Sequence, residues 1–123
     1  MALRGIRGAI TVDQNSKEAI LKETTYLLQR LIQENELDIS DIATVFFSVT
    51  TDLNAEFPAV AARKLGLTDT PLMCMTEIPV HESLQACIRI LMQVNSEKLQ
   101  KDMKHLYLKE AIALRPDTQA VSL

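Results

Sequence analysis

The sequence predicts an α/β (α+β) domain in which a mixed β-sheet carries two helices on one face. Apolar, β-rich runs alternate with helical patterns in the first half of the chain, and further strand-like runs follow in the second half. The 123 residues include only 3 Gly and 4 Pro, which indicates long elements joined by short loops. We therefore expect one domain with the element order β-α-β-α-β-β-β.

The first strand and the first helix are expected within the N-terminal third of the chain. A strand over residues 3–12 contains Gly5 and Gly8, and glycine inside a strand often marks a bulge or a close backbone approach. Apolar residues at helical spacing then predict a long amphipathic helix over residues 16–35. Asn15 precedes this pattern and is the expected N-cap of the helix.

A second strand and a second helix are expected in the middle of the chain. Residues 43–50 are β-rich and apolar, which is typical of a buried strand. Pro58 suits the first turn of a helix, because the N–H that proline lacks would have no partner there. This helix is expected to run to Leu65 and to stop at Gly66, and a short strand over residues 72–75 follows.

The C-terminal part of the chain is predicted to contain two long strands. The first spans residues 85–94 and the second residues 105–114, with a polar turn or short helix over residues 96–103 between them. Pro116 would end the last strand. Two helices cover only one face of such a sheet, and the apolar strands leave few polar positions for the other face. We therefore expect an oligomer that buries the second face.

Composition and charge argue against several classes of protein. The chain has 13 basic and 16 acidic residues, a net charge of −3, no Trp and 4% aromatic residues, unlike a general nucleic-acid binder. The N-terminal residues lack the apolar core of a signal peptide, and no apolar run approaches the ~20 residues of a membrane span. Cys74 and Cys87 lie in apolar runs and are expected to be reduced core residues of a cytoplasmic protein.

Three arginines in apolar surroundings are the feature most informative about function. Arg89 lies within the apolar run 86–92, and Arg7 and Arg115 also have apolar or small neighbours. A guanidinium stays charged at any working pH and requires acceptors when it leaves water. Each arginine alone fits a structural ion pair, but the three together favour a pocket for an anionic ligand. Strand alternation would place Arg115 on the same face as Tyr107.

Other kinds of chemistry find little support in the sequence. Glu77 is the acid nearest the middle of these arginines, and its role is either to pair with one of them or to accept from a ligand hydroxyl. His81 and His105 lack the spacing of a metal site, Cys74 has no base in a local motif, and Gly-rich phosphate loops are absent. We expect neither a metal nor a cofactor. The protein either binds a ligand without reaction or catalyses through positioning and fixed charge.

Several motifs, distributed over nearly the whole chain, are similar to those of one enzyme family. They are RGIRGAITV at 4–12, FPA at 57–59, CMTE at 74–77, CIR at 87–89, HLYL at 105–108 and LRPD at 114–117. With these motifs the sequence closely resembles the AroH-class monofunctional chorismate mutases from about residue 3 to residue 117. We accordingly expect a single domain over residues 1–117 and a short, mobile C-terminal tail over residues 118–123.

The resemblance implies an architecture and a reaction. Members of this family form a homotrimer with the appearance of a pseudo-α/β-barrel, and their active sites lie between subunits. They convert chorismate to prephenate, the branch step towards phenylalanine and tyrosine, by a pericyclic rearrangement that uses no cofactor. The implied partners are therefore the substrate and two further copies of the chain, with no nucleic acid and no membrane.

The resemblance also implies roles for individual residues. Arg7 and Tyr107 would hold a substrate carboxylate, and Arg89 would lie against the ether oxygen that leaves in the reaction. Glu77 would accept a hydrogen bond from the ring hydroxyl, which the backbone at Cys74 would also contact. The remaining expected residues line the pocket or its mouth: Phe57, Ala59, Arg63, Leu72, Met73, Leu114 and Arg115.

Two other functions remain compatible with an anion pocket of this kind. One is a trimeric imine deaminase of the RidA type, which has a similar overall shape and grips a carboxylate with arginine. The other is a non-enzymatic trimer that binds a dicarboxylate without turnover. Assays of imine hydrolysis and of chorismate turnover distinguish the three possibilities.

Overall fold

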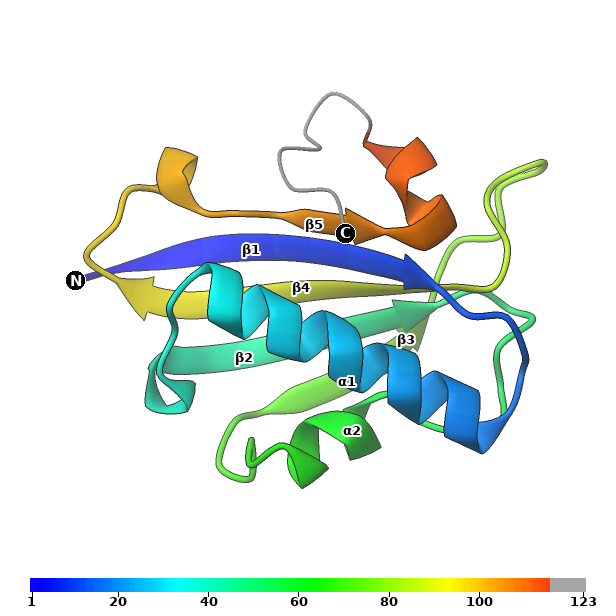
Figure 1. Cartoon of the computed structure of the whole chain (residues 1–123), viewed down its shortest axis with the longest axis horizontal. Coiled ribbons are helices and arrows are strands. Elements are labelled where there is room, and N and C mark those ends of the chain that lie inside the picture. Colours follow the sequence, from blue (N-terminus) through cyan, green and yellow to red (C-terminus); the bar gives the residue numbers. More distant parts are fainter. Residues whose placement is uncertain (116–123) are drawn as a thin grey trace.

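A five-stranded sheet carries two α-helices on one of its faces (Figure 1). The computed structural model describes residues 1–115. The strands are β1 Ala2–Thr11, β2 Ile42–Val49, β3 Leu72–Thr76, β4 Cys87–Ser96 and β5 Leu106–Leu108. The helices are α1 Lys17–Glu34 and α2 Ala59–Lys64, with short 3-10 helices η1 Ile39–Asp41, η2 Gln100–Asp102 and η3 Lys109–Leu114. The predicted fold class and order of the main elements are confirmed, and the tail predicted over residues 118–123 lies outside the described residues.

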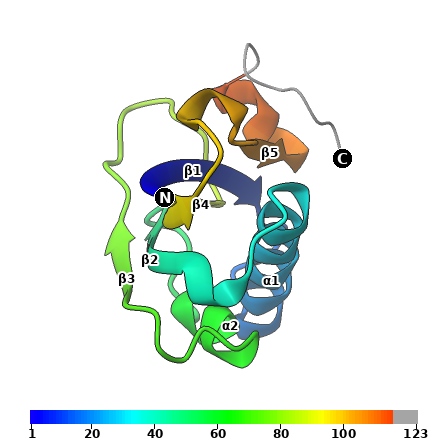
Figure 2. The ribbon, with the colours of Figure 1, turned by 90° about the vertical axis from the view of Figure 1, so that its left-hand side faces the viewer.

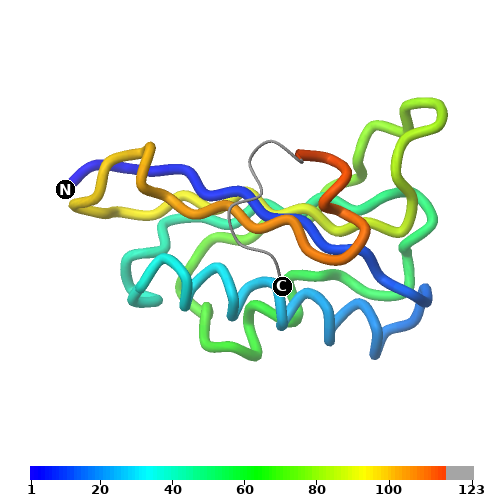
Figure 3. The backbone as a smooth tube through the Cα atoms, turned by 45° about the horizontal axis from the view of Figure 1, so that its top comes forward, coloured from blue at the N-terminus to red at the C-terminus, as the bar shows by residue number. Residues whose placement is uncertain are grey.

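The sheet is mixed, as predicted, and its strand order is β3-β2-β4-β1-β5. The central strand β4 runs antiparallel to both β1 and β2, whereas the edge strands β3 and β5 run parallel to their neighbours. Figure 2 views the molecule along the strands, with α1 and α2 on the same side of the sheet. β1 pairs with both β4 and β5, and Figure 3 shows the three backbones running alongside one another, so the N-terminal strand joins the two C-terminal ones.

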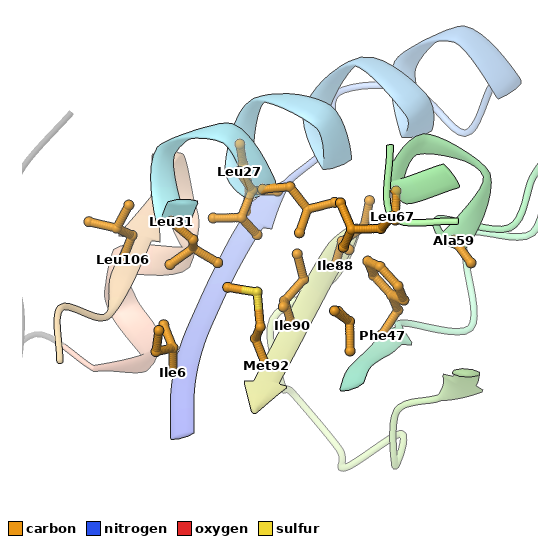
Figure 4. Close-up of a cluster of buried hydrophobic side chains, with 14 of the residues drawn as sticks. Ile6, Leu27, Leu31, Phe47, Ala59, Leu67, Ile88, Ile90, Met92 and Leu106 are labelled. Carbon is orange, nitrogen blue, oxygen red and sulfur yellow. The ribbon is translucent and has the colours of Figure 1, made fainter. Parts of the chain in front are cut away.

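The hydrophobic core lies between the sheet and the helices (Figure 4). Alternate residues of β1 and β4, such as Ile6 and Ile90, meet Leu27 and Leu31 of α1, and all four are almost completely buried. A Cβ built on Gly8 would lie 2.9 Å from Leu31 Cδ1. Glycine therefore allows the close approach of α1 to β1, as its position inside a strand suggested.

The N-cap of α1 differs from the prediction by one residue. Ser16, not Asn15, caps the helix, because its Oγ accepts from the backbone N–H of Ala19 at 3.1 Å. The side chain of Asn15 instead accepts from the backbone N–H groups of Asn54 and Ala55 at 3.0 and 3.1 Å. Asn15 thus ties the start of the helix to the loop before α2, a contact between segments distant in the sequence.

The last predicted strand is much shorter than expected. Residues 105–114 were predicted to be extended throughout, but β5 ends at Leu108 and η3 follows directly. The break occurs at Lys109, whose φ is 55°. A left-handed residue cannot continue a strand. Likewise Ala86, with φ of 51°, delays the start of β4 to Cys87.

Candidate active site

One row of side chains crosses the sheet on the face opposite the helices. Arg89 of β4 pairs with Ala9 of β1 on one side and with Ser48 of β2 on the other, and Ala9 pairs in turn with Tyr107 of β5. Directly paired residues point to the same face of a sheet. The residues before and after Arg89 belong to the helix-side core, so Arg89 itself points away from the helices.

A second row lies two residues further along the strands. Arg7 of β1 pairs with Leu91 of β4, and Leu91 pairs with Phe46 of β2. Arg7 and Arg89 therefore lie on the same face of adjacent strands, although they are far apart in the sequence. Strand register is what brings the two cations together.

The two rows form the floor of a pocket of about 660 Å³, a volume typical of small-molecule sites. η3 contributes to its wall through Leu114, and the chain immediately after η3 contributes Arg115. The described residues that line it are Arg7, Gly8, Phe46, Phe47, Ser48, Met75, Glu77, Arg89, Ile90, Leu91, Tyr107, Leu114 and Arg115. Three guanidinium groups and one carboxylate in this lining favour an anionic ligand.

Glu77 lies beside Arg89 and is held there by a serine. The Oγ of Ser48 donates a hydrogen bond of 2.5 Å to Glu77 Oε1, and the same oxygen lies 3.6 Å from Nε of Arg89. The side chains of Arg89 and Glu77 are 41% and 28% exposed, so a ligand in the pocket can reach both. The carboxylate compensates part of the positive charge of Arg89, and the remaining charge can interact with an anionic ligand.

The guanidinium of Arg89 contains a buried donor without an acceptor. Its Nε is out of contact with solvent and has no hydrogen-bond partner among the described residues, because 3.6 Å to Glu77 is too long for a hydrogen bond. Such buried, unpartnered groups are rare in folded proteins and call for an explanation, such as a catalytic role. The backbone of Arg89 is held in place by the pairing of β4 with β1 and β2.

The backbone of Arg7 is hydrogen-bonded to a histidine side chain. Its backbone N–H donates to Nδ1 of His105 at 3.0 Å. Burial, and secondly the charge of Arg7, lower the pKa of His105, so the imidazole is neutral at pH 7 and can accept this bond. Within residues 1–115 the side chain of Arg7 forms no ion pair. Its charge is therefore available to a ligand anion.

The other predicted site residues lie elsewhere in the single chain. Phe57 and Cys74 line a second pocket of about 310 Å³, which shares Met75 with the first. Ala59 and Leu72 were expected to line the pocket, but they do not line it in the single chain. Ala59 is 5% exposed, and both residues pack in the helix-side core. Arg63 and Met73 are exposed but line neither pocket. The structure thus brings together six of the predicted residues: Arg7, Glu77, Arg89, Tyr107, Leu114 and Arg115.

The two cysteines are free thiols, as predicted, and neither is activated. Burial raises the pKa of Cys87 to about 11 and also raises that of Cys74. Both are therefore protonated at pH 7, and a protonated thiol is a poor nucleophile.

Among the residues that the structure describes, no group of three or more His, Cys, Asp or Glu side chains is placed to hold a metal ion. No helix within residues 1–115 is long and apolar enough to cross a membrane.

Comparison with known proteins agrees with this geometry. A profile of the family described as "Chorismate mutase type I" matches residues 3–118. The chain belongs to this family. It is therefore an enzyme, an isomerase of the chorismate mutase class. Family membership decides against the imine deaminase and the non-enzymatic binder that the sequence alone had left open.

Named relatives cover almost the whole chain. Chorismate mutase AroH of Bacillus subtilis is 42% identical over 118 residues, which are 95% of this chain and 93% of the relative. Chorismate mutase AroH of Thermus thermophilus is 43% identical over 119 residues, which are 96% and 98% of the two chains. The solved structure of a chorismate mutase from Clostridium thermocellum is 50% identical, with a TM-score of 0.87 over 89% of this chain and 97% of that one.

Some residues that line this pocket were not predicted from the sequence. Ser48, Phe46 and Leu91 line it, but their sequence pattern predicts only that they lie within apolar strands. Ser48 carried a usable signal, because it is a polar residue that alternates with apolar core residues of β2. Phe46 and Leu91 carried none, since an apolar residue in a strand is equally compatible with either face.

Proposed function

We propose that the pocket on the open face of the sheet binds chorismate and accelerates its rearrangement to prephenate through restraint and fixed charge. The observation that carries this proposal is the position of Arg89, at the centre of the pocket floor, with Arg7 on the adjacent strand. Chorismate carries two carboxylates, and the guanidinium groups supply matching charge. The conversion breaks one C–O bond and forms one C–C bond within a single molecule, so no general acid, base or nucleophile is required.

Restraint of the substrate is the first contribution. The reactive conformer of chorismate folds its enolpyruvyl arm over the ring, and a pocket that holds both parts removes the entropic cost of finding that arrangement. Arg7 and Tyr107 hold a carboxylate at one end, and the apolar side chain of Leu114 limits the space available to the ring. Glu77 accepts a hydrogen bond from the ring hydroxyl and so fixes the orientation of the ring.

Stabilisation of developing charge is the second contribution. Negative charge grows on the ether oxygen as the C–O bond breaks, and Arg89 is the cation proposed to face it. A guanidinium that is already in place binds this charge more strongly in the transition state than in the substrate. The partial exposure of the Arg89 side chain supports this role, because substrate can approach its terminal nitrogens.

The second group of predicted residues is proposed to complete the site from a neighbouring subunit of a homotrimer. Phe57 and Met73 are large apolar residues that remain 67% and 57% exposed, as expected of surfaces that a further copy covers. Phe57 and Arg63 lie on or next to α2, away from the pocket floor. In a closed trimer each pocket would then receive its second wall from the next chain.

The decisive experiment for the activity mixes the purified protein with chorismate. The readouts are the loss of chorismate absorbance and the identification of prephenate as the product. We expect strong acceleration over buffer. A folded protein of confirmed oligomeric mass that gave no acceleration would contradict the proposal.

The site between subunits is tested by mixing two impaired variants, Arg89→Lys and Phe57→Ala, from the two groups of residues. If each site draws on two chains, some sites in mixed trimers receive both wild-type groups, and activity should exceed that of either variant alone. Activity that stayed at the average of the two variants, in trimers shown to have exchanged chains, would place each complete site within one chain.

A further inference from the structure

The chain changes direction between two parts of the proposed active site, at Lys109. Tyr107 precedes this residue on β5, and Leu114 and Arg115 follow it along or just after η3; all three line the pocket. Lys109 has a φ of 55°, in the left-handed region that residues other than glycine seldom occupy. Such a conformation persists only where surrounding contacts hold it.

The contact that holds Lys109 lies in another layer of the molecule. Its Nζ is 2.5 Å from Oε2 of Glu23, on α1, which covers the opposite face of the sheet from the pocket. The side chain of Glu23 is only 10% exposed, and the described residues provide it with no other ion pair. A carboxylate buried to this degree needs a cation, so the pair constrains both partners.

We propose that the Glu23–Lys109 ion pair positions η3, and with it Leu114 and Arg115, over the chorismate pocket. The inference rests on the proposed function of that pocket. Glu23 and Lys109 are positioning residues that touch no substrate. They fasten the start of η3 to α1, and the backbone N–H of Glu110, which donates to Thr11 Oγ1 at 3.2 Å, fastens it to β1 as well.

The expected effect on KM and kcat follows from the role of the pocket wall formed by Leu114 and Arg115. Leu114 and Arg115 contact or attract the substrate before and during the reaction alike, whereas Arg89 acts on charge that appears only in the transition state. Loosening the wall removes binding that is equal in both states, which raises KM and leaves kcat nearly unchanged. A variant of Arg89 should show the opposite pattern, with the larger loss in kcat.

The test compares Lys109→Gln and Glu23→Gln with the charge-swapped double variant Glu23→Lys/Lys109→Glu. Gln at position 109 keeps an unbranched polar side chain and a backbone preference similar to that of Lys, although it is shorter, and it removes the charge. Lys22→Gln is the matched control, because Lys22 lines the same groove beside α1 but forms no ion pair among the described residues. KM, kcat and amide hydrogen exchange of residues 110–115 are measured for each folded variant.

In the two single variants we expect KM to rise about tenfold, equivalent to about 1.4 kcal/mol in kcat/KM, with kcat within about twofold of wild type. Exchange over residues 110–115 should become at least about tenfold faster, since local opening no longer has to break the ion pair. The swapped variant should recover most of both effects, and Lys22→Gln should show neither. Unchanged KM and exchange in the single variants, or a swapped variant as impaired as they are, would overturn the proposal.

Hydrogen exchange keeps this inference separate from the proposed function. If the wild-type protein failed to convert chorismate, the proposed function would fail whatever the exchange of η3. If the wild type were active but the exchange of residues 110–115 were the same in all variants, the pocket assignment would stand and the positioning role of Glu23 and Lys109 would be wrong.

Discussion

Ser48 and Arg89 share one oxygen of Glu77. Ser48 donates to Oε1 at 2.5 Å, and Arg89 Nε lies 3.6 Å from the same atom. The serine therefore keeps the carboxylate beside the guanidinium without a direct hydrogen bond between the two. This spacing leaves Arg89 with charge that a substrate can use.

Replacing Ser48 with Ala should lower kcat about tenfold, the effect of losing one hydrogen bond to a charged group. Without the serine, Glu77 is free to move towards Arg89 and to compensate its charge more fully. Thr44→Ala is the control, because Thr44 lies at another position on β2 and donates its hydrogen bond to Gln93 of β4. Steady-state kinetics check the prediction, and equal kcat values for Ser48→Ala and Thr44→Ala would contradict it.

Arg89→Lys should fold normally but lose at least about a hundredfold in kcat. Lysine keeps a positive charge but not the planar, forked set of donors, and losing one donor to a developing oxyanion costs about 10²–10³ in rate. Arg30→Lys is the matched control, since the side chain of Arg30 is only 15% exposed and pairs with Glu34 on α1, on the other face of the sheet. Wild-type turnover in Arg89→Lys would remove Arg89 from the mechanism.

Gly8→Ala should destabilise the fold by about 1–3 kcal/mol, because the new Cβ overpacks the contact between β1 and α1. The Cβ would lie 2.9 Å from Leu31 Cδ1 and 3.2 Å from Leu27 Cδ1, both in the core. Gly5→Ala on the same strand has its nearest neighbour at 3.9 Å and should change stability by less than about 0.5 kcal/mol. Urea unfolding of the two variants gives the comparison, and equal midpoints would show that α1 yields easily.

Acid should weaken the fold partly through His105. Burial, and then the charge of Arg7, lower its folded-state pKa below the ordinary 6.5. The unfolded chain thus binds a proton more readily, so the stabilising effect is complete above about pH 6.5 and is lost as the pH falls through the folded-state pKa. His105→Asn retains an acceptor but does not titrate. Between about pH 7.5 and about pH 5, the thermal midpoint should fall further in wild type than in His105→Asn. Parallel pH profiles would exclude a role for His105.

The main elements were predictable because their signals are local. The spacing of apolar residues located α1, and the β-rich runs located β1, β2 and β4. The ends of elements were harder to predict where a long-range contact decides them. Lys109 and Ala86 adopt positive φ, but neither residue type signals this conformation in a sequence as glycine or asparagine does. The N-cap of α1 similarly depends on the loop at Asn54, which draws Asn15 away from the helix.

The candidate site was predictable in its charges and only partly in its composition. Arginines within apolar strands pointed to an anion pocket, and Arg7, Arg89 and Arg115 indeed line one pocket. Arg115 reaches it from the end of η3, however, and not by strand alternation with Tyr107. The role of Ser48 as the donor to Glu77 became visible only once β2 and β4 were paired.

Alternation along each strand, which the sequence determined by itself, separates the residues of the core from those of the open face. It cannot say which residues of different strands become neighbours, since a shift of two residues in register preserves the faces and changes every pair. The tertiary structure decided that Tyr107, Ala9, Arg89 and Ser48 form one row, through packing between segments far apart in the chain. With the adjacent row of Arg7, Leu91 and Phe46, it places arginines that are distant in the sequence in one pocket.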